Sequence, residues 1–242
     1  MNRYKIELQY LGKNYHGWQK QPNAHTVQAE IESKLNQLMQ QEIEIIGCGR
    51  TDTGVHASHY AAHFDFDESV DCSKIKISLN RMLPADISIL SIYEVASDFH
   101  ARFSAVSREY KYFIDFEKSA FRGDIAWNNR VDLDFNILAN ACEIIKNHKH
   151  FTAFCKGEIP NNSDVCIIHE AIWEQTEMGL IFTVKANRFL RNMVRAMVGT
   201  LIEVGTKKIS IQQFQEILNS GTRSDAGKSV PAHGLFLTKV EY

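Results

Sequence analysis

One carboxylate stands between threonines and glycines in residues 49–57, which read G-R-T-D-T-G-V-H-A. The glycines resemble those of a phosphate-binding loop, but the G-x-x-x-x-G-K-[ST] spacing that a nucleoside triphosphate requires is absent. Asp52 can bond its own backbone in an Asx-turn, which is the commoner role of aspartate in such a turn. Alternatively it can act as a carboxylate nucleophile. Arg50 could then hold its charge from the same side of an extended backbone.

Three histidines follow closely, at His56, His59 and His63. His59 and His63 would share one face of a strand, where a metal ion could bridge them. A metal-dependent phosphoesterase that uses these histidines with Asp52 is therefore an alternative, and it predicts that a chelator abolishes activity. No third group of ligands supports a metal site, so we favour a site without metal.

The elements that would position Asp52 follow from the spacing of apolar residues. Residues 4–11 alternate polar and apolar side chains as in a half-buried strand, and a helix is expected from about residue 26. Two strands, residues 42–48 and 59–66, would form a hairpin whose enlarged tip carries Asp52. A helix over residues 73–82 and a strand over residues 87–95 complete the first half.

The second half has the same order of elements with one helix added. We expect strands over residues 107–116, 165–175, 180–186 and 234–241, and helices over residues 135–146, 187–203 and 209–219. The order β-α-β-β-α-β is that of a ferredoxin-like unit, in which helices cover one face of an antiparallel sheet. We therefore predict an α+β fold of two such units, with a mainly antiparallel sheet, helices on one face and a central catalytic cleft. The first unit, residues 1–103, carries the catalytic loop, and the second is residues 104–242.

Arginines recur on one side of the helix expected over residues 187–203. Arg188, Arg191 and Arg195 fall away from its apolar stripe. A solvated face is the commoner explanation of such spacing, and an edge that contacts phosphate is the alternative. Further basic residues would border the same cleft and favour the alternative: Arg50, Arg102, Arg108 and Lys111.

Composition limits the class of protein. The 242 residues are 44% hydrophobic, which suits one large or two small domains, and the formal net charge is -2. A nucleic-acid partner would therefore need a local basic surface. The first ten residues do not form the apolar region of a signal peptide, no run is long enough to span a membrane, and the five cysteines form no C-x-x-C pair. We expect a soluble cytoplasmic protein with reduced thiols.

Several segments resemble the TruA family of tRNA pseudouridine synthases. Besides residues 49–57 they are N-Y-H-G-W-Q at 14–19, F-H-A-R-F at 99–103, S-R-E-Y-K-Y at 107–112, F-L-R-N-M-V-R at 189–195 and P-A-H-G-L at 231–235. The resemblance implies isomerisation of uridine to pseudouridine at positions 38, 39 and 40 in the anticodon stem and loop of tRNAs, by a homodimer without cofactor. Residues 120–129 match the family poorly, and Ser229 and Val230 stand where other small residues are usual.

The resemblance also implies roles for single residues. Asp52 is the nucleophile, Tyr110 packs against the target uracil, and Arg50 and Arg195 flank the carboxylate and the displaced nucleotide. By spacing alone we would favour a core residue at Tyr110, because it alternates with two further apolar positions on a strand. Arg188 and Arg191 are the other candidates for substrate binding.

A non-catalytic RNA-binding module is a second alternative. Ferredoxin-like sheets bind single strands through aromatic side chains. Such a module would carry the RNP1 pattern, K/R-G-F/Y-G/A-F-V-x-F/Y, and no segment of the sequence supplies it.

Overall fold

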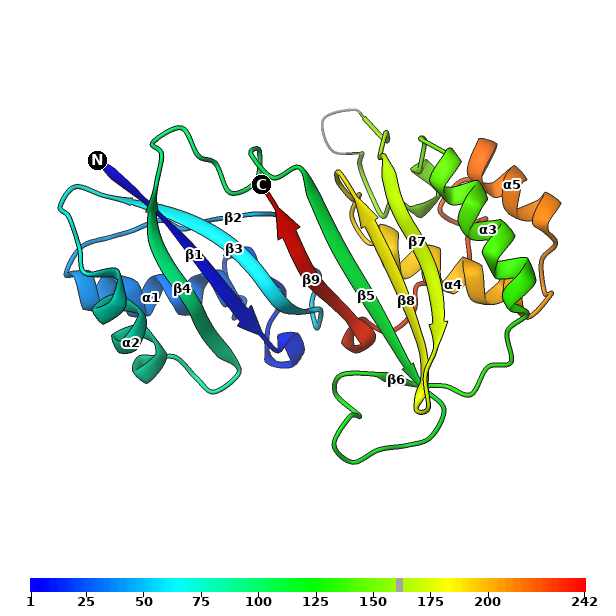
Figure 1. Ribbon diagram of the computed structural model, residues 1–242, viewed down its shortest axis with the longest axis horizontal. Helices are drawn as coiled ribbons and strands as arrows, with labels where there is room; N and C mark the ends of the chain where they lie inside the picture. The colour runs from blue at the N-terminus through cyan, green and yellow to red at the C-terminus, as the bar shows by residue number, and fades with distance from the viewer. Residues whose placement is uncertain (160–162) are drawn as a thin grey trace. The chain divides into compact units, whose positions relative to one another are not determined.

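The computed structural model describes residues 1–159 and 163–242, and the chain forms two compact units (Figure 1). Unit 1 comprises Met1–Val106 and Phe236–Tyr242, and unit 2 comprises Ser107–Leu235. The last strand, which the sequence analysis assigned to the second unit, therefore lies mostly in unit 1. That each unit is a ferredoxin-like domain stays a prediction.

Unit 1 contains strands, two α-helices and one 3-10 helix. Its strands lie in the order β4-β1-β3-β9, with the short β2 on β3. The pairs of β1 with β3, β1 with β4 and β2 with β3 are antiparallel, and β3 with β9 is parallel. The strands are β1 (Asn2–Tyr10), β2 (Ile46–Gly47), β3 (His56–Phe66), β4 (Ile87–Val95) and β9 (Leu235–Glu241). The helices are α1 (Val27–Met39), α2 (Cys72–Met82) and the 3-10 helix η1 (Gly12–Asn14).

The core of unit 1 contains the apolar side chains that alternate along β1 and those that recur at helical spacing along α1. Apolar side chains of β1 with no more than 3% exposure are Tyr4, Ile6, Leu8 and Tyr10, and those of α1 are Val27, Ile31 and Leu35. Thr26, expected near the helix start, is the N-cap, and its side chain accepts a hydrogen bond from the N–H of Ala29. Both β1 and α1 could be predicted from the sequence, because the spacing of their own apolar side chains and the cap at Thr26 specify them.

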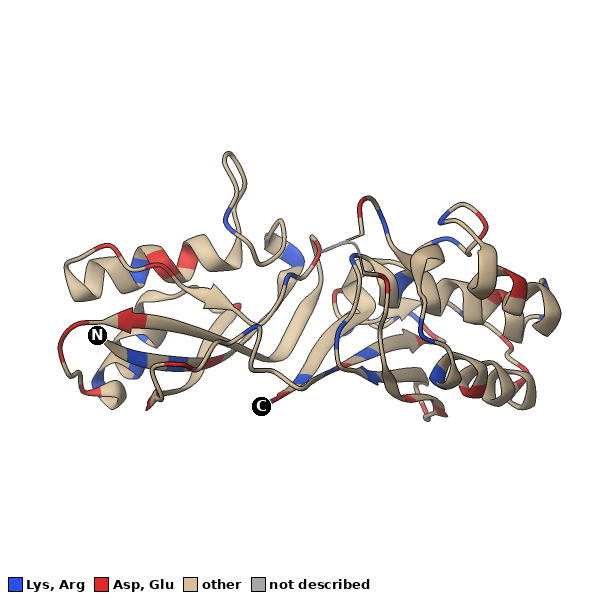
Figure 2. Cartoon of the chain, turned by 90° about the horizontal axis from the view of Figure 1, so that it is seen from above, with Lys and Arg blue, Asp and Glu red and all other residues tan. Residues whose placement is uncertain are grey.

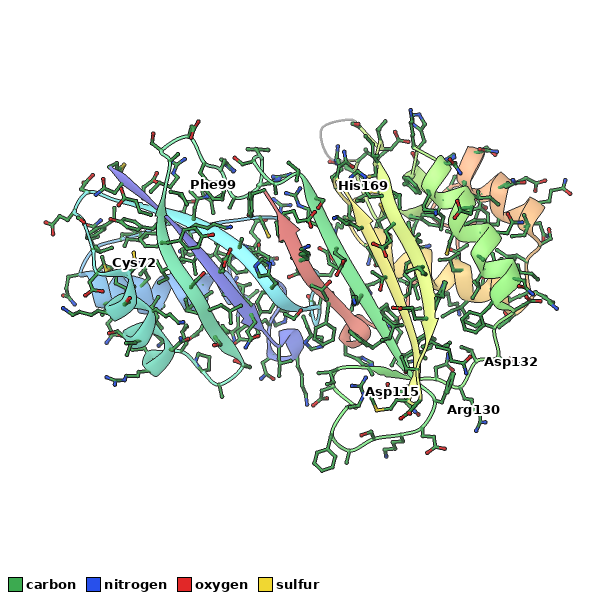
Figure 3. All side chains as sticks on the ribbon, viewed as in Figure 1. Cys72, Phe99, Asp115, Arg130, Asp132 and His169 are labelled. Atoms are coloured by element: carbon green, nitrogen blue, oxygen red, sulfur yellow. The ribbon has the colours of Figure 1, made fainter. Side chains whose placement is uncertain are left out.

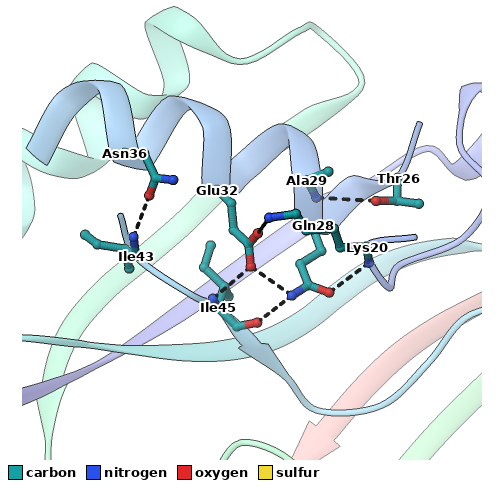
Figure 4. Close-up of polar contacts among 8 residues, drawn as sticks. All are labelled: Lys20, Thr26, Gln28, Ala29, Glu32, Asn36, Ile43 and Ile45. Carbon is teal, nitrogen blue, oxygen red and sulfur yellow. Dashed lines mark hydrogen bonds and ion pairs between the residues drawn. The ribbon is translucent and has the colours of Figure 1, made fainter. Parts of the chain in front are cut away.

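The strand expected over residues 42–48 is mostly absent, and side chains of α1 explain why. The N–H of Ile45 donates to Glu32 Oε1 at 3.0 Å, and the carbonyl of Ile45 accepts from Gln28 Nε2 at 2.9 Å (Figure 4). Both backbone groups are thus satisfied without a neighbouring strand. Only the two residues of β2 pair with β3.

Unit 2 contains four strands, three α-helices and two 3-10 helices among its described residues. Its strands lie in the order β5-β8-β7, antiparallel, and β6 runs parallel to β5. The strands are β5 (Ser107–Asp115), β6 (Trp127–Asn128), β7 (Ile168–Gln175) and β8 (Gly179–Ala186). The helices are α3 (Phe135–Asn147), α4 (Met193–Gly205), α5 (Ile211–Ser220) and the 3-10 helices η2 (Thr152–Phe154) and η4 (Ala232–Gly234).

The helix predicted over residues 187–203 begins only at Met193, so this prediction was wrong for residues 187–192. Asn187 and Ile167 exchange two hydrogen bonds: the N–H of Asn187 donates to the carbonyl of Ile167, and Asn187 Oδ1 accepts from the N–H of Ile167 at 2.8 Å. Asn192 has φ of 65°, which a right-handed helix does not allow. Contacts with a distant segment therefore replace the first helical turns.

The α+β class is confirmed: the described ranges contain nine strands and five α-helices. Lysine and arginine are mixed with aspartate and glutamate along both units (Figure 2), in keeping with the formal net charge of -2. Among the helices described, none has the length and hydropathy to cross a bilayer.

Candidate active site

Asp52 lies in the loop that joins β2 to β3, as the sequence predicted. The N–H of Cys48 still bonds the carbonyl of Ala61 at 2.8 Å, and beyond it the chain leaves the sheet. The backbone closes a turn at Asp52, whose carbonyl accepts from the N–H of Val55 at 3.1 Å. Gly54, inside that turn, has φ of +78°, a conformation that favours glycine. The Asp52 side chain is half-buried on this loop.

The segment N-Y-H-G-W-Q, residues 14–19, is hydrogen-bonded to the backbone of this loop. The N–H of Trp18 donates to the carbonyl of Thr51 at 3.3 Å, and the carbonyl of Tyr15 accepts from the N–H of Gly54 at 3.3 Å. Gly17 has φ of +87°, and a Cβ on it would lie 2.3 Å from the carbonyl oxygen of Thr51. Glycine is therefore required at this position, for its φ and for the close approach of the two backbones.

Aromatic side chains fix both ends of the loop. The rings of Trp18 and Tyr60 stack with centroids 4.0 Å apart, and the Tyr60 hydroxyl donates to the carbonyl of Gly49. The hydroxyls of Tyr10 and Thr51 lie 2.8 Å apart in a buried hydrogen bond. Asp52 is thus one residue from a buried anchor, an arrangement that positions a reactive group at little entropic cost. Apart from the family resemblance of residues 14–19, no pattern in the sequence indicated these anchors.

Arg50 does not hold Asp52 in the way the sequence analysis envisaged. Its side chain is exposed, and no ion pair joins it to Asp52 in the part of the chain that the structure describes. A contact with substrate therefore remains the role to test for Arg50.

The three histidines of β3 serve the structure of unit 1. His56 is fully buried, its Nδ1 accepts from the N–H of Gly12 at 2.9 Å, and its ring stacks on Phe236 at 4.5 Å. His63 Nδ1 accepts from the N–H of Ala101 at 3.1 Å, and burial lowers the pKa of His63 to about 4. Both rings are therefore hydrogen-bond acceptors for the backbone.

His59 is the third histidine of β3, and its recorded contact is with a side chain rather than with the backbone. Its Nε2 lies 3.9 Å from Glu7, and burial lowers the pKa of His59. Over residues 1–159 and 163–242 no three histidine, cysteine or acidic side chains are grouped as metal ligands would be.

Tyr110, in unit 2, lies on β5 opposite Val184 of β8. It is half-buried, whereas Tyr112 and Ile114 further along the strand are at most 1% exposed. The Phe189 ring meets Tyr110 edge-on, with centroids 5.1 Å apart and planes at 88°. Tyr110 is thus not an ordinary core position of its strand, and Phe189, which sequence reasoning did not single out, orients its ring.

The three arginines of unit 2 do not form the predicted helical strip. Arg188 and Arg191 lie in residues 187–192, before α4, and the carbonyl of Arg191 accepts from the N–H of Lys156 at 3.0 Å. Arg195 lies in the first turn of α4, where its Nε donates to the carbonyl of Val230 at 2.8 Å. Arg195 is therefore oriented by the backbone of Val230, 35 residues further along the chain.

Two of the family-like segments meet around Arg195. The N–H of Val230 donates to the carbonyl of Arg195 at 3.2 Å, and Asn192 Nδ2 donates to Ser229 Oγ at 2.7 Å. The Tyr112 hydroxyl donates to the carbonyl of Pro231 at 2.9 Å. Unit 2 thus joins residues 189–195 to the segment around P-A-H-G-L, although sequence spacing alone could not show this.

Comparison with known proteins identifies the class to which this arrangement belongs. The family model described as tRNA pseudouridine synthase matches residues 8–104 and 148–242. The chain is 45% identical to tRNA pseudouridine synthase A of Azobacteroides pseudotrichonymphae, over 100% of this chain and 97% of that protein. It is 44% identical to the protein of that name from Parabacteroides distasonis, over 100% and 96%.

A more distant relative matches over its whole length as well. The protein named tRNA pseudouridine synthase A of Dictyoglomus thermophilum is 39% identical, over 100% of both chains. The chain therefore belongs to the tRNA pseudouridine synthase family, whose members are isomerases.

Proposed function

We propose that this chain converts uridine to pseudouridine at positions 38, 39 and 40 in the anticodon stem and loop of tRNAs, with Asp52 as the nucleophile. The observation that supports this most is the Asp52 loop: a carboxylate on a turn whose neighbour Thr51 is bonded to Trp18 and Tyr10, in a chain of this family. Such a carboxylate can approach a nucleoside without first being ordered.

The reaction breaks the C1′–N1 bond of uridine and forms a C1′–C5 bond. The uracil gains a proton at N1 and loses one at C5, so that product and substrate are isomers. The carboxylate of Asp52 can act by adding to C6 of the uracil or by assisting departure of the base at C1′. Both routes use an anion beside the ribose, and both require that the base does not escape before C5 is joined.

The uridine must also leave its stack, which costs a few kcal/mol. We propose that Tyr110 offers a flat surface to the displaced uracil and that Arg50, Arg188, Arg191 and Arg195 contact the nucleotide and its phosphates. The bidentate geometry of arginine suits phosphate oxygens. The edge-on contact of Phe189 with Tyr110 supports this role, because it fixes the plane of the tyrosine ring.

Further parts of the proposal follow from the family resemblance. They are a cytoplasmic homodimer that needs no cofactor, and two ferredoxin-like domains with a catalytic cleft. Sedimentation of the purified chain with and without tRNA tests the dimer.

The test of the function is incubation of the pure protein with unmodified tRNA transcripts, without added metal or nucleotide, followed by mapping of pseudouridine. We expect product at positions 38 to 40. Asp52→Asn should reduce the rate by roughly 10⁴-fold or more, as loss of a nucleophile does, while tRNA binding persists. Conversion by Asp52→Asn at the wild-type rate, or no conversion of any transcript with uridine at these positions, would refute the proposal.

A further inference from the structure

An exposed aromatic ring stands in the segment that follows β4. Residues 99–103 carry F-H-A-R-F, a motif that the reaction at Asp52 leaves unused, and Phe99 at its start is labelled in Figure 3. The side chain of Phe103 is 71% exposed. Such an exposed phenylalanine indicates a binding site when hydrogen bonds and ring contacts hold the residues around it in place.

The surroundings of Phe103 are ordered by His100. The two rings lie with centroids 4.4 Å apart, and His100 Nδ1 accepts from the N–H groups of Arg102 and Phe103 at 3.2 and 3.3 Å. The N–H of His100 in turn donates to Ser104 Oγ at 2.9 Å. The guanidinium carbon of Arg102 lies 5.4 Å from the centre of the Phe103 ring. An aromatic face and a cation are thus presented together.

The segment is also anchored to the body of unit 1. Ala101 has 0% exposure, its N–H donates to His63 Nδ1 at 3.1 Å, and its carbonyl accepts from the Tyr242 hydroxyl at 2.9 Å. The carbonyl of Phe99 accepts from Arg3 Nη1 at 2.8 Å. Because the backbone that carries Phe103 is already ordered, a ligand that stacks on the ring need not order it.

This ring lies far from Asp52 within unit 1. The anchor residue Arg3 is near the start of the nine-residue strand β1, whereas Tyr10 at its end bonds Thr51, beside Asp52. At about 3.3 Å per residue, the seven steps from Arg3 to Tyr10 span about 23 Å. Phe103 is therefore anchored toward the opposite end of β1 from Asp52, and a folded RNA is large enough to reach both places.

We propose that Phe103, with Arg102 and His100, is a stacking platform for an unpaired base of the RNA substrate, remote from the uridine that reacts. This rests on the proposed function, because that function supplies the RNA. Unpaired bases are recognised by stacking on aromatic rings and guanidinium planes, whatever their sequence. Arg102 adds a positive charge for the phosphate beside the stacked base.

The experiment measures the equilibrium binding of an unmodified tRNA transcript to the full chain. Phe103→Ala should weaken binding by about 5- to 100-fold, which corresponds to the loss of one base–aromatic stack. Phe103→Tyr keeps the ring and should bind within about twofold of wild type. Phe103→Leu keeps an apolar side chain without a π face and should behave as Phe103→Ala does. Ile77→Ala, at an exposed apolar position of α2, is the control for loss of exposed apolar surface.

Any other outcome contradicts the proposal that Phe103 is a stacking platform. Wild-type binding by Phe103→Ala or Phe103→Leu contradicts stacking, and so does a loss of the same size in Ile77→Ala. A change in sedimentation of Phe103→Ala without RNA would show that the ring contacts another copy of the chain instead. If wild type converts tRNA and Phe103→Ala binds it normally, the platform alone is refuted. If wild type converts no transcript, the proposed function fails, whatever the binding shows.

Discussion

Two loops carry Asp52, Arg50, Arg188 and Arg191, four of the residues proposed to act on RNA, and the loops are held in different ways. Residues 49–55 in unit 1 are bonded to one nearby segment, residues 10–18, and to the stacked pair of Trp18 and Tyr60. Residues 187–192 in unit 2 are bonded to segments around Ile167 and Lys156, and Arg108 Nη1 donates to the carbonyl of Asn187 at 2.9 Å. The first loop is bonded to one neighbouring segment and to Tyr60, whereas the second is bonded to several separate segments.

The chemistry of the contacts differs as well. In unit 1 two backbone N–H groups, those of Gly12 and Ala101, donate to the imidazoles of His56 and His63. An imidazole accepts such a bond only while that nitrogen is unprotonated. In unit 2 the corresponding groups are the amide of Asn187 and the guanidinium of Arg108, and neither bond depends on an unprotonated imidazole nitrogen. The comparison therefore predicts that steric change and acid affect unit 1 more than unit 2.

Gly17→Ala should have the largest effect on stability. It places a Cβ 2.3 Å from the carbonyl of Thr51 at a φ of +87°, so the backbone beside Asp52 must move. We expect unfolding to become easier by roughly 2 to 4 kcal/mol, measured by chemical denaturation.

Variants at two other glycines distinguish the effect of a positive φ from the effect of the close backbone approach at Gly17. Gly157 also has positive φ, +82°, but a Cβ there would meet nothing within 4 Å, so Gly157→Ala should cost only about 1 kcal/mol. A Cβ on Gly49 likewise meets nothing within 4 Å, and its φ is not in the left-handed region, so Gly49→Ala should stay within about 0.5 kcal/mol of wild type. Equal losses in Gly17→Ala and Gly157→Ala would show that the close approach to Thr51 is unimportant.

The sequence predicted the elements that local spacing controls. The strand expected over residues 87–95 is β4 (Ile87–Val95), the helix expected from about residue 26 starts behind its cap Thr26, and the Asp52 loop is a loop. Alternating apolar side chains and a capping hydroxyl act within a few residues, so they can be read without the fold.

The errors fall where backbone groups bond to distant side chains. Glu32 and Gln28 replace the expected strand partner of Ile45, and Asn187 bonds Ile167, 20 residues away. Apolar spacing carries no information about such partners, so residues 42–48 were predicted as a strand and residues 187–192 as a helix. For the candidate site, the motif indicated Asp52, but the need for glycine at Gly17 follows only from the close approach of two backbones.

Acid should destabilise the protein through His63 in unit 1. Burial lowers the pKa of His63 to about 4, from an ordinary value of 6.5. Between these values the unfolded chain binds the proton and the folded chain does not, so stability is highest above pH 6.5 and is lost as the pH falls toward 4. The expected loss between pH 7.5 and 5 is about 2 kcal/mol from this residue.

His63→Asn tests the assignment, because an amide oxygen can accept the bond from Ala101 without titrating. Denaturation at pH 7.5 and 5 should show a smaller difference for this variant than for wild type. Some difference should remain, because burial lowers the pKa values of His59 and His100 in the same direction. A difference of the same size in both proteins would contradict the role of His63.

The smallest effect is expected in the loop of unit 2. Asn187→Ala removes the oxygen that accepts from the N–H of Ile167, which should cost about 1 kcal/mol. Since the other contacts of residues 187–192 remain, the loop should keep its course, and the measurable consequence for the proposed reaction is a higher KM for tRNA with little change in kcat. Asn187→Asp keeps an accepting oxygen in the same place and should lose less stability than Asn187→Ala. If the two variants lose equally, or if Asn187→Ala loses as much as Gly17→Ala, then the loop in unit 2 is as sensitive to one change as the Asp52 loop is, and the contrast between the two loops is wrong.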